Sequence, residues 1–384
     1  MRKLQQRLNV LGADPPLEVT GRFTDETNEA VLAFQRQSFA DDANEWDGIV
    51  GPHTWGKIDT DYRPPEIDAT EEAAGAHVVG AIDQLNNQAS GPDAGVWYSY
   101  NYRGAYPERY KDDYAAGYAD PSLFTRERAL AWRVKPRTSA AAALQSWMRG
   151  LTIAECYTAL VASEFDALRG MIGDEKFDQA FGSTDRNVPK HQRMFIAAGG
   201  SQVVNYFAKT EGAESGDDGT AGNRPAKPGE WYYFMNHPCY LLKHPGGAWQ
   251  GENSIYMGRE GTDKKQMWAG LGTSGGTGPG GPTHVTEDQM LAEMVEAYNL
   301  DRDEDDERAL AAAKAANGGV LDPQLDPANK AFPEKLSGPD DILNAEPRSL
   351  QVNGGPNDSF VRHGGFVRGY GIRLDIEKVQ ALRD

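Results

Sequence analysis

The sequence predicts an α+β fold in two parts, a small helical module followed by a larger mixed unit. In residues 1–59, apolar side chains recur at helical spacing. Further along, a helix-like apolar run starts at Cys156, and strand-like segments follow at 231–235, 254–257 and 267–272. A helix followed by a run of strands favours the α+β class. We therefore expect a three-helix module and one α+β domain with long loop insertions.

Three short helices are expected in residues 1–59. Their apolar positions are, in chain order, Leu4, Leu8 and Leu11; Ala30, Val31 and Phe34; and Trp55 and Ile58. Gly12 ends the first helix, and Thr24 stands where the second helix needs an N-cap. A tight turn at Asp47-Gly48 precedes the third helix.

Residues 1–59 closely resemble the peptidoglycan-binding domain 1 family. The resemblance lies in three segments in the family's order: LQQRLNVLG, TGRFTDETNEAVLAFQRQ and DGIVGPHTWGKI. One departure is Thr20-Gly21-Arg22-Phe23-Thr24, where the family usually has Asp-Gly-Xaa-Phe-Gly. The resemblance implies a module that holds cell-wall peptidoglycan, without naming the residues of 1–59 that contact it. A module kept only for folding or docking is the alternative.

Polar and proline-rich residues at 60–75 are typical of a linker, so that 76–384 form the second unit. Three stretches in that unit, 212–228, 272–282 and 301–359, are expected to be loops or mobile insertions.

Composition excludes several classes of function. The net charge of −18 argues against nucleic acid and anionic membrane surfaces as partners. No stretch approaches the roughly 20 apolar residues of a membrane span, and no signal peptide is visible at the N-terminus. The seven histidines are scattered without ligand spacing, so neither a metal site nor a cofactor is expected.

Cys156 is the candidate nucleophile. It is one of two cysteines, and a position at the start of a helix favours the thiolate. The competing interpretation is a small buried core residue, which is also the expectation for Cys239. A disulfide between the two is compatible with the sequence, although nothing in the sequence indicates it.

The order of a helix-start cysteine and then strands is that of a papain-like or NlpC/P60-like domain. The local sequences are more specific, because they are similar to bacterial spore-coat type protein-glutamine gamma-glutamyltransferases. The matching segments are Glu155-Cys156-Tyr157-Thr158-Ala159, Asn236 with Pro238, and Trp249-Gln250-Gly251-Glu252-Asn253 with Ile255 and Gly258. The recognisable core runs from about 133 to 299, and nothing is recognised beyond 300.

The resemblance implies that Cys156 is the nucleophile, Glu252 its catalytic partner and Glu155 a supporting acid. Glu252 as a surface carboxylate and Glu155 as a plain helix-terminal acid are the alternatives. The family's histidine after the glutamate strand is replaced by Ala269. His284, His237 and His244 are the candidates to replace it. Asn253 and Trp249 are further auxiliary candidates, Trp249 also as a packing residue.

The leading hypothesis is a cysteine-dependent glutamine acyltransferase tethered to peptidoglycan. A thiolate attacks the γ-carboxamide of glutamine, ammonia leaves, and a lysine amine or water resolves the thioester. The substrates would be protein or peptide side chains of Gln and Lys. An NlpC/P60-like endopeptidase or amidase with a histidine base is the first alternative, and a catalytically degenerate wall-binding protein is the second. A wall-binding module without a visible signal peptide suggests non-classical delivery to the envelope or outside, as for an antibacterial effector.

Overall fold

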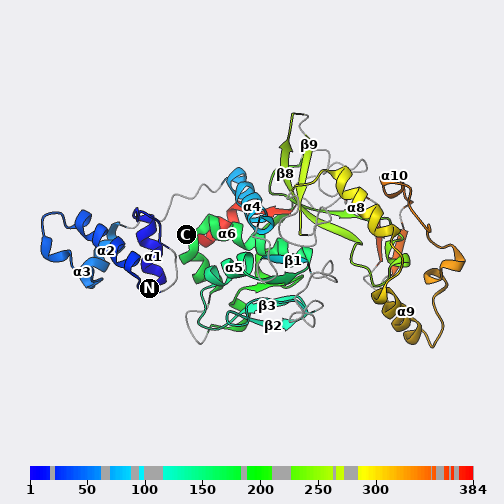
Figure 1. The fold of residues 1–384 in the computed structure, drawn as a ribbon, viewed down its shortest axis with the longest axis horizontal. Coiled ribbons are helices and arrows are strands. Elements are labelled where there is room, and N and C mark those ends of the chain that lie inside the picture. Colours follow the sequence, from blue (N-terminus) through cyan, green and yellow to red (C-terminus); the bar gives the residue numbers. More distant parts are fainter. Residues whose placement is uncertain are drawn as a thin grey trace. The chain divides into compact units, whose positions relative to one another are not determined.

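The chain forms two compact units, Met1–Asp68 and Ala69–Asp384. Their elements are labelled in a computed structural model (Figure 1). It describes residues 1–17, 22–61, 70–87, 95–98, 116–182, 188–209, 226–262, 265–271, 284–346, 348–351, 359–362, 365–366 and 372–383. The predicted insertions at 212–228 and 272–282 lie almost wholly outside these residues.

The first unit contains the three predicted helices, α1 (Arg2–Val10), α2 (Asp25–Ser38) and α3 (Pro52–Asp61). They enclose a core of Leu4, Leu8, Leu17, Val31, Phe34 and Ile58. Thr24 is the N-cap of α2, where its hydroxyl accepts from the N–H of Thr27. The capping prediction is confirmed.

The side chain of Gln35 fixes the turn that leads into α3. Its Nε2 donates to Asp47, Ile49 and Thr54, and its Oε1 accepts from the N–H of Gly48. A fully buried amide that satisfies the turn in this way compensates for its own burial.

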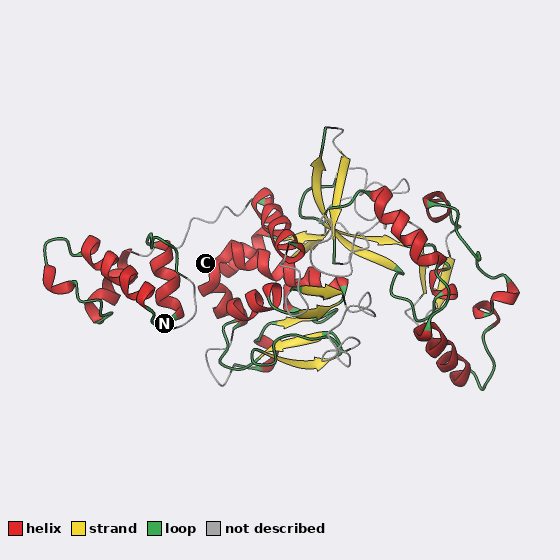
Figure 2. Ribbon diagram, viewed as in Figure 1, coloured by secondary structure: helices red, strands yellow, loops and turns green. Residues whose placement is uncertain are grey.

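An antiparallel sheet is the centre of the second unit (Figure 2). Its order is β6 (Phe207–Lys209), β13 (Ile372–Leu374), β7 (Trp231–Met235), β8 (Gly251–Glu260) and β9 (Lys265–Ala269), with β12 (Gly365–Phe366) also paired to β7. All three predicted strand segments are found in it. Strand β8 does not end at Gly258 as expected but passes through it in a bulge, where φ is +109°.

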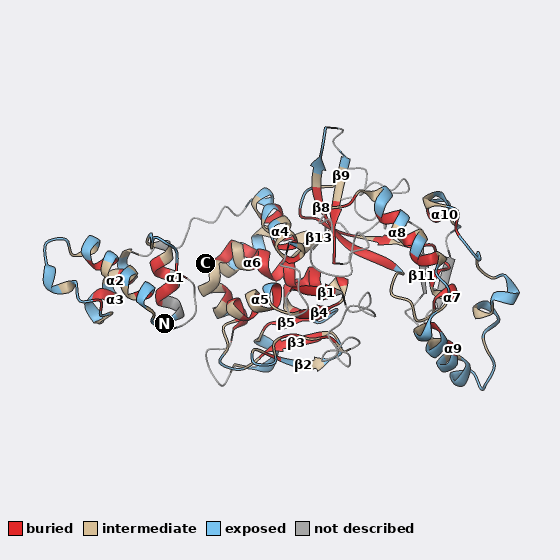
Figure 3. Ribbon diagram, viewed as in Figure 1, coloured by how far each residue is buried: buried red, intermediate tan, exposed pale blue. Residues whose placement is uncertain are grey.

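Helix α6 (Cys156–Phe181) is buried along most of its length (Figure 3). It packs against α4 (Glu71–Asn86), α5 (Ala140–Arg149) and the C-terminal α11 (Ile376–Arg383). Helix α4 begins at Glu71, so the end of the predicted linker 60–75 is helical. Both α4 and α6 also contact β8.

Shorter strands lead the chain into α6. Strand β1 (Val96–Tyr98) pairs in parallel with β4 (Thr152–Ala154), which ends two residues before Cys156. Strands β2 (Phe124–Arg128), β3 (Ala131–Val134) and β5 (Phe195–Ile196) form a separate antiparallel sheet.

The prediction of loops throughout 301–359 is wrong. Helices α9 (Glu304–Ala316) and α10 (Pro339–Leu343) lie there, and β10 (Arg348–Gln351) pairs with β11 (Ser359–Arg362). Leu336 and Ile342 join a core that also contains residues of β7, β9 and α8 (Glu287–Asn299). These elements were hard to predict from the sequence because each of them has few buried apolar residues. Of α9, only Asp306 and Leu310 are buried.

Candidate active site

Cys156 is the first residue of α6, directly after the N-cap Glu155. The Glu155 carboxylate accepts from the N–H of Tyr157 at 2.9 Å and of Thr158 at 2.6 Å, and also from the Thr158 hydroxyl. These bonds satisfy donors that every helix leaves free at its start. The same carboxylate lies 3.9 Å from the Cys156 sulfur, measured from Oε2 to Sγ. Glu155 is therefore both a cap and a direct neighbour of the thiol.

Asn253 on β8 forms the second contact with the sulfur. Its Nδ2 donates to Cys156 Sγ at 3.2 Å, across 97 positions of sequence. Its Oδ1 in turn accepts from the indole Nε1 of Trp231, on the neighbouring strand β7, at 3.0 Å. Sheet and helix are thus joined at the sulfur by side-chain hydrogen bonds.

Glu252 precedes Asn253 on β8 and is buried, with 1% of its surface exposed. None of the described residues donates a hydrogen bond to its Oε1. Gly270 lies beside it, so close that a Cβ there would come within 2.5 Å of Glu252 Oε1. The missing side chain at Gly270 gives the carboxyl group its space. An unsatisfied buried carboxyl oxygen costs free energy, so a functional role would explain why it is kept here.

Burial and like charge disfavour ionisation of all three groups in this cluster. Burial raises the pKa of the Cys156 thiol well above its usual range, and Glu252 and Glu155 raise it further, against the hydrogen bond from Asn253. The pKa of Glu252 is raised by burial, by Glu293 of α8 and by Glu155. Burial also raises the pKa of Glu155, despite its bonds to Thr158 and Tyr157. The expected helix-start thiolate is thus opposed by its surroundings, since three acids share one dry site.

His284 bonds elsewhere. Its Nε2 lies 2.7 Å from Asp83 Oδ1 on α4, and its Nδ1 lies 2.5 Å from Glu260 Oε1 on β8. Both ring nitrogens are engaged with carboxylates. Glu260 ends β8, eight positions beyond the Glu252 of the cysteine cluster.

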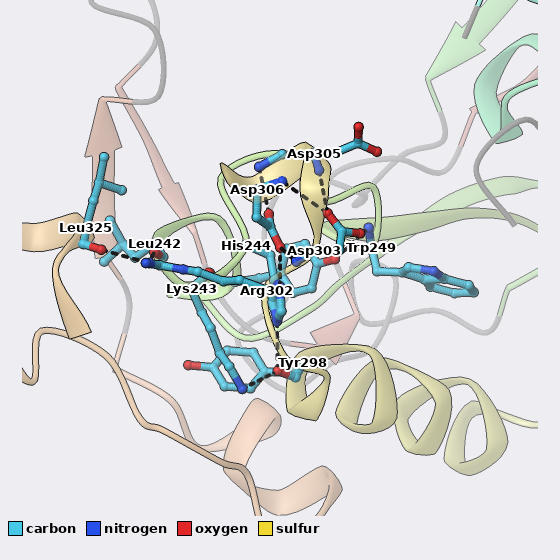
Figure 4. A network of polar contacts seen from close by, with 12 residues as sticks. Leu242, Lys243, His244, Trp249, Tyr298, Arg302, Asp303, Asp305, Asp306 and Leu325 are labelled. Carbon is cyan, nitrogen blue, oxygen red and sulfur yellow. Dashed lines mark hydrogen bonds and ion pairs between the residues drawn. The ribbon is translucent and has the colours of Figure 1, made fainter. Parts of the chain in front are cut away.

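His237 and His244 belong to a polar network between the β7–β8 connection and helices α8 and α9, the part around His244 being drawn in Figure 4. His244 Nδ1 lies 2.9 Å from Asp306 Oδ2, and its Nε2 lies 3.0 Å from the Tyr298 carbonyl oxygen. His237 accepts from the N–H of Cys239 and packs against the Tyr298 ring. Neither histidine hydrogen-bonds to Cys156 among the described contacts.

Two cations complete the network of Figure 4. Arg302 donates to the carbonyls of Lys243, Leu242 and Leu325, and Lys243 donates to those of Tyr298 and Glu334. They hold the end of α8 to the short helix α7 (Tyr240–Lys243). Trp249 is half-buried against the core of this region, and its carbonyl accepts from Asn236.

The remaining sequence expectations concern Ala269, Cys239 and metals. Ala269 is buried and pairs with Ile255 in the sheet. Among the described contacts, no histidine hydrogen-bonds to Cys156 in place of the histidine that the family usually has. Cys239 is buried and, like Cys156, not in a disulfide. In the parts of the chain that the structure describes, no group of three His, Cys, Asp or Glu could hold a metal ion. In the same parts, no helix is long and apolar enough to cross a membrane.

Reasoning from sequence missed two members of this site. Trp231 reads as an ordinary aromatic strand residue, and only the pairing of β7 with β8 puts its indole next to Asn253. Gly270 reads as a strand terminator, and only the fold shows which carboxyl group it accommodates. The only hint in the sequence to this part of the site was the pair Glu252-Asn253 in the family-like segment.

Comparisons with known proteins give a family match and a similarity to a solved structure. Residues 1–58 match the model of a family described as a putative peptidoglycan binding domain. Among solved structures, a transglutaminase from Geobacillus stearothermophilus, without its C-terminal extension, is similar at 16% identity and a TM-score of 0.38, over 59% of this chain and 82% of that one. No curated protein matches the chain.

Proposed function

We propose that this protein is a cysteine-dependent acyltransferase that acts on glutamine side chains at the bacterial cell wall. The observation that carries the proposal is the hydrogen bond from Asn253 to Cys156 at the junction of α6 and β8, with the buried Glu252, the preceding residue of β8, close enough to raise the pKa of the thiol. Together with Glu155, these residues give a sulfur nucleophile, an amide donor, and a carboxyl group whose Oε1 has no hydrogen-bond partner in the described part of the chain. These are the groups that acyl transfer through a thioester needs.

In the proposed reaction, Glu252 acts in its ionised form and takes the proton of the Cys156 thiol as the sulfur attacks the γ-carbonyl carbon. The tetrahedral intermediate collapses, the C–N bond breaks, and the same proton leaves with ammonia. An amine then attacks the thioester and passes a proton through Glu252 back to the sulfur. Glu155 has a supporting role in this proposal. Three hydrogen bonds from Tyr157 and Thr158 hold its carboxylate in the helix cap next to the sulfur.

The test measures incorporation of a labelled amine into a glutamine peptide. We expect Cys156→Ala to abolish it and Glu252→Gln to lower it at least about a hundredfold, the scale of a lost general base. Cys239→Ala is the matched control, since it removes the other buried cysteine and should keep the activity. Because burial raises the pKa of both Cys156 and Glu252, the rate should increase as the pH rises above neutral.

Other outcomes would favour the alternatives. Cleavage of peptidoglycan stem peptides without amine incorporation would replace the transferase by an endopeptidase or amidase. That enzyme needs a histidine base, which the contacts of His237, His244 and His284 do not supply at Cys156. No Cys156-dependent change in either assay would leave a wall-binding protein without catalysis.

For the first unit, we propose that it binds peptidoglycan and places the enzyme in the cell envelope. The family match over residues 1–58 supports this. Isolated sacculi should sediment the full chain but not a chain that lacks residues 1–61. Recovery of both proteins in the pellet would contradict the assignment. Delivery as an antibacterial effector remains part of the proposal through this pairing of a wall module with an enzyme.

A further inference from the structure

The orientation of the Asn253 amide is fixed by its neighbour. An asparagine amide has one accepting and one donating end, and the two are told apart only by their partners. The indole N–H of Trp231 is a donor and nothing else, so the atom it meets at 3.0 Å must be Asn253 Oδ1. The NH₂ group is thereby turned toward Cys156 Sγ, at 3.2 Å.

We propose that Asn253 is a catalytic residue that donates a hydrogen bond to the Cys156 thiolate, and that Trp231 is the positioning residue that holds its amide in the donating orientation. The proposal rests on Cys156 being the nucleophile of the proposed function. Asn253 would stabilise the thiolate form of Cys156 in a site that otherwise disfavours a negative charge on the sulfur. No group is transferred by Asn253, which donates the hydrogen bond before and after the proton moves to Glu252.

The charges around the sulfur make such a donor necessary. Glu155 faces Cys156 from the helix cap and Glu252 from β8, and Glu293 of α8 acts on Glu252. Burial and the two carboxyl groups raise the pKa of Cys156, while hydrogen bonds from the side chain and, to a smaller extent, the backbone of Asn253 lower it. An N–H donor is worth most to an anion in a buried site.

The sheet places Trp231 for this task. In the β7–β8 register, Trp231 pairs with Ile255 and Tyr233 with Asn253, so Trp231 and Asn253 are diagonal neighbours on one face. The indole is packed edge-on against Tyr157 of α6, at 4.8 Å between ring centroids, and against Phe207 of β6, at 6.1 Å. Rings on two sides restrict the rotation of the indole and so help to fix the direction of its N–H.

The experiment titrates Cys156 in the full chain and does not depend on a substrate. The thiolate is followed by its ultraviolet absorbance, with Cys156→Ala subtracted to remove Cys239. In parallel, the rate of alkylation by iodoacetamide is measured against pH, with peptide mass spectrometry separating the two cysteines. We compare Asn253→Ala, Trp231→Phe, the double variant and Phe207→Leu, which alters packing on Trp231 without removing its N–H.

We expect Asn253→Ala to raise the pKa of Cys156 and to slow alkylation about tenfold at any pH below it, the worth of one hydrogen bond to an anion. Trp231→Phe should slow it by a smaller factor, about threefold, because the amide is then free to turn. In the Asn253→Ala background, Trp231→Phe should change nothing further. Phe207→Leu should stay within about twofold of the native rate.

Three results would overturn the proposal. The first is an unchanged Cys156 titration in Asn253→Ala. The second is an equal effect of Trp231→Phe with and without Asn253, which would make Trp231 a packing residue. The third is an effect of Phe207→Leu as large as that of Trp231→Phe. If the titrations behave as expected but no amine is incorporated, the donor role stands and the acyl-transfer function fails. If amine incorporation depends on Cys156 but the titrations do not respond, only the donor role fails.

Discussion

Gly270 shows how much one missing side chain can decide at the residue scale. A Cβ at this position would collide with the backbone oxygen of Asn253 and come within 2.5 Å of Glu252 Oε1. Both groups belong to β8, so the proposed proton acceptor depends on the glycine that directly follows Ala269 at the end of β9. Single residues of this site are therefore tuned by neighbours that the sequence does not mark.

Gly270→Ala should destabilise the second unit by about 1–3 kcal/mol, because an added methyl group in a packed site forces the backbone or Glu252 to move. Urea unfolding measures this. Gly80→Ala is the matched control. Gly80 lies in helix α4, and a Cβ at this position would have no atom within 4 Å. This substitution should be neutral or stabilising by up to about 1 kcal/mol. Equal effects of the two substitutions would contradict the steric account.

Glu164 gives a pH-dependent prediction. It is fully buried in α6, neither of its oxygens has a hydrogen-bond partner among the described residues, and burial raises its pKa to about 8. Between about pH 4.5 and 8 the unfolded chain has lost this proton while the folded chain keeps it. Over that range, Glu164 should lower the free energy of unfolding by about 1.4 kcal/mol for each unit by which the pH rises.

Replacing Glu164 by Gln should remove this slope, and the exposed Glu296→Gln should keep it. The measurement is the free energy of unfolding at about pH 5 and about pH 7.5. A Glu164→Gln protein with the native pH dependence would show that the carboxyl group ionises in the fold.

At the scale of elements, the hydrogen bonds of His284 tie the segment before α8 to both α4 and β8. Burial alone would lower the pKa of His284, but Asp83 and Glu260 outweigh it, so that the pKa is raised. The protonated ring therefore stabilises the fold fully below the unfolded value of about 6.5, and this stability is lost as the pH rises through the folded value.

We expect His284→Gln to destabilise the second unit by roughly 0.5–1 kcal/mol at about pH 6, in keeping with a partly exposed ion pair. At about pH 9 the variant and the native protein should melt alike. Asp83→Asn should reproduce part of the loss. A larger loss at high pH than at low pH would reverse the assigned sign.

The prediction of elements succeeded where a segment has its own period or cap and failed where burial is sparse. Thr24, the strand 231–235 and the helix after Cys156 are all apparent locally. Helix α9 was missed because its face toward the core is limited to Asp306 and Leu310. Asp306 is held there by His244 and the N–H of Gly246, partners about 60 positions away.

At the scale of the whole molecule, the C-terminus completes structures begun much earlier in the chain. Strand β13 pairs with β6 and β7, and α11 packs on α6. Leu374 and Val379 are almost fully buried in these contacts. Residues beyond 300, in which no family was recognised from the sequence, thus contribute a helix that packs on the helix that presents Cys156.

Val379→Ala should therefore cost roughly 1.5–3 kcal/mol of stability, the worth of a buried aliphatic side chain. Its exposed neighbour Gln380→Ala should stay within about 0.5 kcal/mol of the native protein. Thermal unfolding of both variants checks this. A loss in Gln380→Ala equal to that in Val379→Ala would mean that α11 does not pack on α6 through Val379.

The sequence by itself determined the three-helix module, the helix start at Cys156 and the candidate status of Glu252, because periodicity, caps and short motifs are local properties. Only the tertiary structure decided which groups surround the sulfur. In the folded chain, His284 and His244 bind carboxylates away from Cys156. Asn253, whose amide contacts Trp231, donates to the thiol. The reason is physical. Strand pairing and helix packing join positions nearly a hundred residues apart, and no local pattern encodes that distance.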